Sequence, residues 1–157
     1  MANTPNKENI IELHIRHTPG GAFTDALFGD GTPSINAVKV KDILRLEGPL
    51  GTFFLRENST KPIIFLASGT GFAPIKSVIE GALEKGIKRE MNLFWGVRKS
   101  SELYMNDLAL DWAKKIPNFK YTPVVSDEDD NSKWSGKTGF VHHAVISDFS
   151  DLINYAV

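Results

Sequence analysis

The chain has 157 residues, of which 41% are hydrophobic and 24% charged, and its formal net charge at pH 7 is −1. This composition is typical of a globular protein that buries a core, and the near-neutral charge gives no electrostatic reason to expect a nucleic acid or an anionic membrane as partner. The absence of cysteine excludes disulfides, thiolate nucleophiles and cysteine-held metal clusters within the chain. The longest apolar runs are far shorter than the roughly 20 residues that span a bilayer. The start lacks the apolar stretch of a secretory signal, so we expect a cytoplasmic protein with no membrane partner.

The first third of the chain has the alternating apolar and polar pattern of half-buried antiparallel strands. Strands are expected at 11–16, 43–46 and 52–55, a turn at 48–51, a short helix at 24–28 and a loop at 29–37. These short alternating runs predict part of an antiparallel sheet or barrel.

Beyond residue 60 the pattern changes to continuous apolar runs that alternate with helical periodicity. Strands are expected at 62–67, 91–97, 119–126 and, as a beginning only, 154–157, with helices at 75–83, 102–115 and 141–147. Strand–helix units in series predict a parallel α/β sheet with right-handed crossovers.

The segment from Gly69 to Pro74 lies where the first buried strand turns into the first helix. Gly69 and Gly71 permit a close approach to the backbone, and the helix N-terminus that follows presents amides to an anion such as a pyrophosphate. Pro74 suits a first helical turn, and Thr70 adds a hydroxyl. A tight turn that uses its glycines only to turn is the competing interpretation. The segment lacks the third glycine of a dinucleotide fingerprint and the glycine–lysine pair of a nucleotide triphosphate loop.

These motifs together resemble the ferredoxin-NADP reductase superfamily, and within it the CDP-6-deoxy-glucoseen reductase and oxygenase-reductase branch. The resemblance rests on the four segments 19–24, 47–53, 69–74 and 95–104 in this order, and it covers essentially the whole chain. It implies a flavin-binding barrel remnant at 1–58, followed by an NAD(P)-binding α/β domain at 59–157 that lacks its last strand or strands.

For FAD, the resemblance implies a site in the first of these parts. Gly20, Gly21, Phe23 and Thr24 would hold the flavin pyrophosphate at a helix start, and Ile15 and Arg16 would lie on the strand beside the flavin. For Arg16, an exposed strand arginine without a ligand is an equally open interpretation.

For the nicotinamide nucleotide, the resemblance implies contacts from Gly69, Thr70, Gly71 and Pro74, and from residues that follow the next two strands. These are Arg98, Ser126 and Asp127. Because a carboxylate repels a 2′-phosphate and accepts hydrogen bonds from ribose hydroxyls, NADH is favoured over NADPH. Lys133 or Lys137 offers an alternative partner for a phosphate.

Two family motifs are missing from the chain: an arginine-x-tyrosine-serine motif expected before Ala2 and a cysteine-glycine-proline-proline motif expected after Val157. We therefore expect a piece truncated at both ends that binds FAD weakly and is nearly inactive alone. Its unpaired strand edges predict a homodimer or a disordered N-terminus.

The resemblance implies that the parent protein is an NADH-dependent flavin oxidoreductase. It would take hydride onto FAD and pass electrons to an iron–sulfur carrier outside this chain. A non-catalytic nucleotide-binding or scaffold domain is the alternative hypothesis. No metal site is expected, because the adjacent His142 and His143 diverge on a helix and the acidic run at 127–130 lacks the spacing of a calcium loop.

Overall fold

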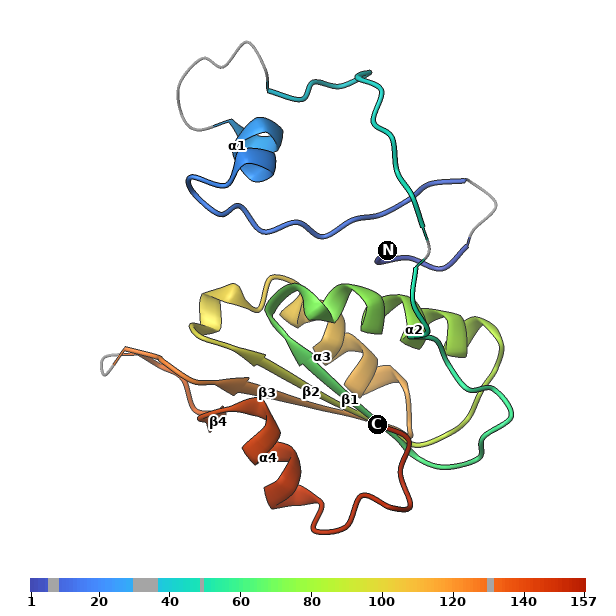
Figure 1. Cartoon of the computed structure of the whole chain (residues 1–157). Helices are drawn as coiled ribbons and strands as arrows, with labels where there is room; N and C mark the ends of the chain where they lie inside the picture. The colour runs from blue at the N-terminus through green and yellow to red at the C-terminus, as the bar shows by residue number, and fades with distance from the viewer. Residues whose placement is uncertain (6–8, 30–36, 49, 130–131) are drawn as a thin grey trace.

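The structure is a computed structural model that describes residues 1–5, 9–29, 37–48, 50–129 and 132–157. Its elements, in chain order, are α1 (Ala22–Phe28), β1 (Ile63–Ser68), η1 (Gly69–Gly71), α2 (Phe72–Glu84), β2 (Met91–Val97), η2 (Ser100–Glu102), α3 (Asn106–Lys115), β3 (Phe119–Val125), β4 (Lys137–Thr138) and α4 (Val141–Asp148). The elements from β1 onward form one layered body, and the chain before β1 loops out above α2 (Figure 1). Among the described helices, none is long and apolar enough to cross a membrane.

Parallel strands form the sheet in the order β1-β2-β3-β4, which confirms the predicted α/β architecture. β1 pairs with β2 as far as Ser68 opposite Gly96, and β2 pairs with β3 as far as Val97 opposite Val125. Because the strands end at the same level, the loops that follow them leave the sheet along one edge. The two-residue strand β4 was not predicted from the sequence.

On the other side of β1, the end of the chain returns to the sheet. The strand expected at 154–157 is present as a single parallel bridge between Ile63 and Ala156. The amide of Ile64 donates to the Ala156 carbonyl at 2.8 Å, and the Ala156 amide donates to the Pro62 carbonyl at 2.9 Å. The sheet therefore grows in both directions from β1, and α/β sheets bind ligands at such a switch point.

Helices cover both faces of the sheet, and each face has its own apolar core. One core lies under α2 and α3; its fully buried members include Phe72, Ile79, Leu93, Trp95 and Ala109. The other lies under α4 and contains Ile64, Phe94, Val124, Val141, Ala144 and Val145. β2 is buried along its whole length, including the polar Asn92, whereas β1, for which the continuous apolar run at 62–67 predicts burial on both faces, leaves Leu66 and Ser68 exposed.

The helix expected at 102–115 is divided into η2 and α3. Leu103, which closes η2, has φ −76° and ψ 64° and is buried, so the chain turns inward there before α3 begins. The helix expected at 75–83 is confirmed within α2, which begins three residues earlier, and Gly86 follows it at φ 66°, a conformation that glycine adopts without strain.

Residues 1–62 are here called the N-terminal segment. The antiparallel strands expected in it are not formed: within the described residues, no strand precedes Ile63. A strand requires a hydrogen-bonded neighbour, and here the apolar side chains that would face a barrel interior are exposed, as Ile11 and Ile43 show. The helix expected at 24–28 is confirmed as α1. Most of the loop expected at 29–37, and Pro49 in the predicted turn, lie outside the described residues.

Candidate functional site

The segment from Gly69 to Pro74, here called the anion loop, begins with a short 3₁₀ turn, η1, between β1 and α2. Gly69 has φ 50°, in the region that favours glycine, whereas Gly71 has φ −59°, which any residue adopts. A Cβ at either position would meet nothing within 4 Å. The backbone conformation therefore explains why residue 69 is glycine but not why residue 71 is. The open space beside Gly71 suits the close approach of a ligand.

Two buried aromatic side chains fix the position of this loop. Trp95 on β2 donates its Nε1–H to the Gly69 carbonyl at 2.9 Å. Phe72, the first residue of α2, stacks on the Trp95 ring at a centroid distance of 4.0 Å and an interplanar angle of 9°. Within the described residues, no side chain accepts a hydrogen bond from an amide of residues 69–73. The loop thus has a fixed backbone, in which the Phe72 amide donates to the Gly69 and Thr70 carbonyls and no described side chain occupies the other amides.

The loop borders a cavity of about 440 Å³ together with residues from distant parts of the chain. Its lining residues are His14, Ile15, Arg16, Gly69, Thr70, Glu102 and Tyr104. The structure therefore brings Ile15 and Arg16, expected at a flavin, next to Gly69 and Thr70, expected at a nicotinamide nucleotide. Pro74 points elsewhere: it lines a second cavity, of about 650 Å³, between α2 and the N-terminal segment.

Residues after β2 and β3 meet at the sheet edge where the anion loop lies. The Arg98 guanidinium contacts the Asp127 carboxylate at 2.9 Å, and both side chains are exposed. This hydrogen bond, with the nearby Lys99 charge, holds the pKa of Asp127 below its usual value. Ser126 turns its hydroxyl back to the Val97 carbonyl at 3.3 Å. Arg98 and Asp127 thus contact each other, and the Ser126 hydroxyl is bonded to the backbone at the end of β2.

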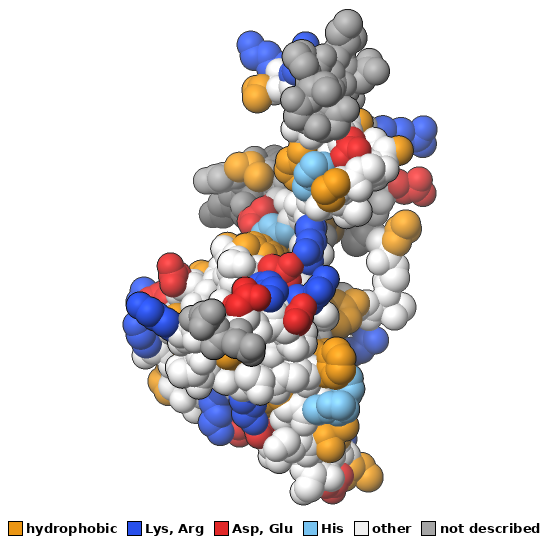
Figure 2. Space-filling model, turned by 90° about the vertical axis from the view of Figure 1, so that its left-hand side faces the viewer, with side chains coloured by type: hydrophobic (Ala, Val, Ile, Leu, Met, Phe, Trp, Pro, Cys, Tyr) orange, Lys and Arg blue, Asp and Glu red, His pale blue; other side chains and the backbone are white. Residues whose placement is uncertain are grey.

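The acidic run after β3 is more structured than the predicted solvated loop. Glu128 accepts a hydrogen bond from the Ser100 amide at 2.7 Å, and Asp129 pairs with Lys99 at 2.7 Å. Hydrogen bonds from Ser100 lower the pKa of Glu128. Basic and acidic side chains intermingle on this face (Figure 2). The carboxylates therefore join the loops after β2 and β3, and Asp130 lies outside the described residues.

The helix start predicted for a flavin pyrophosphate is occupied by contacts within the chain. The Gly20 amide donates to the Asp25 carboxylate at 2.9 Å, and the Gly21 amide donates to the Thr18 carbonyl at 2.9 Å. The Thr24 hydroxyl donates to the same Thr18 carbonyl at 2.8 Å. A Cβ at Gly21 would lie 2.7 Å from the Thr24 hydroxyl, so Gly21 is required for local packing. Both glycine amides of this turn are therefore already paired within the chain, while Phe23 in α1 is 63% exposed.

Glu102 was not predicted as a site residue, yet it connects the N-terminal segment to the sheet edge. Arg16 contacts one Glu102 oxygen at 2.6 Å, and the Arg98 amide donates to the other at 3.1 Å. Burial raises the pKa of Glu102, but these hydrogen bonds and the Arg16 charge more than offset it, so the pKa lies below its ordinary value. Arg16, for which a phosphate contact was one interpretation, is ion-paired. A contact between positions so far apart leaves no local pattern in the sequence.

The histidine pair on α4 does not diverge as predicted. The rings of His142 and His143 lie 4.2 Å apart between centroids, and Phe140 stacks on His142 at 5.7 Å. Among the described residues, no group of three or more potential ligands converges on one point. The pair thus lacks the further ligands that a zinc ion requires.

Comparison with known proteins places this geometry in a family. Residues 65–156 match the family model described as the oxidoreductase NAD-binding domain. The chain is 45% identical over 152 residues to the CDP-6-deoxy-L-threo-D-glycero-4-hexulose-3-dehydrase reductase of Yersinia pestis, a match that covers 97% of this chain and 43% of that protein. It is 34% identical over 157 residues to a probable flavin reductase of Aliivibrio fischeri, covering 100% of this chain and 64% of that protein.

A solved structure has the same arrangement over nearly the whole chain. The crystal structure of a cytochrome P450 reductase from Amycolatopsis superposes with a TM-score of 0.77 at 31% identity, covering 99% of this chain and 45% of that one. This chain therefore spans less than half the length of that reductase and of the Yersinia pestis relative. The chain belongs to the oxidoreductase NAD-binding domain family, within the ferredoxin reductase superfamily.

Proposed function

We propose that this chain is the nicotinamide-nucleotide-binding part of an NADH-dependent flavin reductase, with Gly69, Thr70 and Gly71 holding the dinucleotide pyrophosphate. The observation that carries the proposal is the anion loop: an ordered turn at the sheet edge whose amides no side chain blocks and whose Gly71 has no conformational reason to be glycine. A phosphate placed at the N-terminus of the 13-residue helix α2 is also favoured by the helix dipole.

NADH is favoured over NADPH because of the charges beside the loop. Asp127 pairs with Arg98, Asp129 pairs with Lys99, and Glu128 accepts a hydrogen bond from the Ser100 amide, so among the described residues of these two loops three carboxylates meet two cations. A 2′-phosphate placed there would be repelled, whereas ribose hydroxyls can donate to a carboxylate. Asp127 is the residue we assign to this preference, with Ser126 and Arg98 beside it.

For FAD the residues fit less well. Ile15 and Arg16 line the cavity, but the amides of Gly20 and Gly21 and the hydroxyl of Thr24 are already bonded within the chain. The contacts of this turn therefore leave neither glycine amide for a flavin phosphate. When bound, a flavin would supply the conversion of a two-electron hydride into single electrons.

At the level of the whole protein, we propose that electrons pass from NADH through FAD to an iron–sulfur carrier, in the cytoplasm. Relatives with reductase names, one of them a probable flavin reductase, support the oxidoreductase part. The division into 1–58 and 59–157 agrees with the start of the apolar core at Ile63. The exposed apolar side chains of the N-terminal segment support a homodimer through that face.

The occupied amides at Gly20 and Gly21 favour a second candidate, a nucleotide-binding module that carries no flavin.

Calorimetric titration of the chain with NADH tests the nucleotide site through Gly71→Ala. The substitution fits the backbone and the local space, so the folded state should be retained, but the new methyl group would obstruct the phosphate. We expect affinity to fall roughly tenfold or more, which corresponds to a loss of about 1.4 kcal/mol or more. Gly81→Ala, the same change about three turns later in α2, is the control; its new methyl group would lie 3.3 Å from the Thr4 methyl, away from the phosphate. Equal affinity for both variants and the parent chain would contradict the proposal.

A further inference from the structure

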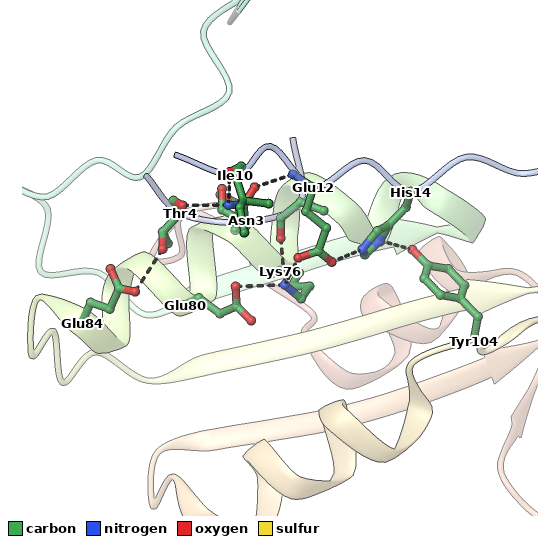
Figure 3. A network of polar contacts seen from close by, with 11 residues as sticks. Asn3, Thr4, Ile10, Glu12, His14, Lys76, Glu80, Glu84 and Tyr104 are labelled. Carbon is green, nitrogen blue, oxygen red and sulfur yellow. Dashed lines mark hydrogen bonds and ion pairs between the residues drawn. The ribbon is translucent and has the colours of Figure 1, made fainter. Parts of the chain in front are cut away.

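Lys76 on α2 is a charged side chain only 6% exposed, and its ammonium group is fully satisfied. Its Nζ donates to the Ala2 carbonyl at 3.0 Å, to a Glu12 oxygen at 3.2 Å and to a Glu80 oxygen at 3.0 Å (Figure 3). An ammonium group has three donors, and these contacts use all of them. Lys76 therefore fixes one oxygen of the Glu12 carboxylate.

The other Glu12 oxygen contacts Nε2 of His14 at 2.7 Å. Glu12 thus lies between a lysine and a histidine, and the hydrogen bond from His14, followed by the contacts with Lys76, keeps its pKa below the ordinary value despite partial burial. An ionised carboxylate can only accept hydrogen bonds. Nε2 of His14 must therefore carry a proton, and in a neutral imidazole this leaves Nδ1 as an acceptor.

Nδ1 of His14 lies 2.7 Å from the Tyr104 hydroxyl, which then has to be the donor. Tyr104 keeps its proton, because burial, and after it the Glu12 charge, raise its pKa to about 12. Its ring is fixed edge-on to Trp95 at 5.2 Å and to Phe72 at 6.2 Å. With its only proton directed at His14, the hydroxyl can offer nothing but lone pairs to a second partner.

His14 and Tyr104 line the cavity beside Gly69 and Thr70, whereas Lys76 and Glu12 do not. We propose that Lys76, Glu12 and His14 set the Tyr104 hydroxyl as a hydrogen-bond acceptor for a donor group of the dinucleotide bound at the anion loop. The donor is a ribose hydroxyl or the carboxamide of the nicotinamide. Lys76 and Glu12 are positioning residues, since they act through His14. The identity of the ligand rests on the proposed function. The polarity of Tyr104, meaning whether its hydroxyl accepts or donates a hydrogen bond toward the cavity, does not.

The substitution Glu12→Gln should reverse this polarity. Lys76 can only donate, so it will hold the amide oxygen of the new side chain and turn the amide nitrogen toward His14. That nitrogen donates to Nε2, the imidazole proton moves to Nδ1, and Nδ1–H donates to Tyr104. The Tyr104 hydroxyl then has a free proton and becomes a donor toward the cavity.

Nitrogen-15 NMR of the histidine rings measures this directly, without any ligand. We expect the Nε2–H tautomer for His14 in the parent chain and the Nδ1–H tautomer in Glu12→Gln. Glu80→Gln is the matched control, because Glu80 contacts Lys76 whereas the described side-chain partners of His14 are Glu12 and Tyr104, and it should retain the parent tautomer. Thermal melts of each variant establish that it is folded. The same tautomer in the parent chain and in Glu12→Gln would overturn the inference.

Titration with NADH and with ADP-ribose tests the ligand. Tyr104→Phe and Glu12→Gln should each weaken NADH binding by roughly threefold to tenfold, the effect of one neutral hydrogen bond. The double variant should be no weaker than either single one, because both remove the same interaction. Loss with NADH alone assigns the carboxamide as donor, and loss with both ligands assigns a ribose hydroxyl. Unchanged affinity in Tyr104→Phe would overturn the assignment. If the parent chain binds neither ligand, the proposed function and the ligand assignment both fail, and the tautomer measurement still decides the polarity.

Discussion

Trp95 and Ile43 are both large apolar side chains, yet Trp95 is fully buried in the sheet and Ile43 is 98% exposed in the N-terminal segment. The same contrast holds for the regions around them. The part of the chain from Ile63 onward buries two apolar cores of its own, one on each face of the sheet. In the segment before it, apolar side chains such as Leu50 and Phe53 remain largely exposed.

The N-terminal segment is instead attached to the rest of the molecule largely through polar contacts. Ser77 donates to the Asn3 carbonyl at 2.8 Å, and the Thr4 hydroxyl donates to Glu84 at 3.0 Å. Lys76 and the pair of Arg16 with Glu102 add charged contacts. The sheet therefore buries enough apolar surface to fold by itself, whereas the N-terminal segment is positioned by a few hydrogen bonds to α2 and η2.

The largest expected difference between the two regions is in stability. Trp95→Ala removes a fully buried ring, its stacking on Phe72 and its hydrogen bond to Gly69, and should lower the free energy of unfolding by about 3–5 kcal/mol. Ile43→Ala should change it by less than about 0.5 kcal/mol. Urea unfolding followed by circular dichroism measures both. Similar effects in the two variants would show that the N-terminal segment has a buried core as well.

A smaller effect on stability is expected when the pH is lowered. Hydrogen bonds from His14 and Lys76 lower the pKa of Glu12 in the folded state, so its contribution is fully present above the unfolded value near 4.5 and is lost as pH falls through the lower folded value. The contribution should be below about 1 kcal/mol, because the carboxylate is 38% exposed and screened. Hydrogen exchange of amides 10–16 at pH 7 and pH 3, in the parent chain and in Glu12→Gln, measures it. An equal acid response in both chains would exclude Glu12 as its source.

The smallest effect on stability is expected at the exposed pair of Arg98 and Asp127. Asp127→Asn should leave the unfolding midpoint unchanged, because both side chains lie largely in solvent. It should still reduce the preference for NADH over NADPH, since it removes a charge that repels the 2′-phosphate. Titration with both nucleotides gives the ratio of affinities. An unchanged ratio would mean that Asp127 does not determine the preference.

Much of the sheet could be predicted from the sequence because local patterns determine it. The continuous apolar run at 62–67 indicates a buried strand, which forms as β1, and the glycines and proline of 69–74 mark the turn into α2. The same local reading failed for the strands at 11–16 and 43–46. A strand also requires a neighbour, and an alternating pattern does not show whether one is present.

Site residues could be predicted from the sequence only where neighbouring positions or strand ends bring them together. Gly69, Thr70 and Gly71 lie together because they are consecutive, and Arg98 and Asp127 meet because parallel strands end at one edge. The contacts of His14 with Tyr104 and of Arg16 with Glu102 join residues about 90 positions apart, so only the folded chain reveals them. The occupied amides at Gly20 and Gly21 depend on where Asp25 and Thr18 point, which spacing alone does not specify.

The central claim is that the amides of the anion loop bind the pyrophosphate of a nicotinamide dinucleotide. The most direct test is a titration of the nitrogen-15-labelled chain with NADH, followed residue by residue through its backbone amide signals. The account predicts the largest shifts at residues 69–73, smaller shifts at 98 and 126–127, and none at residues 142–146 of α4. Saturable binding that leaves the signals of 69–73 unchanged would contradict it.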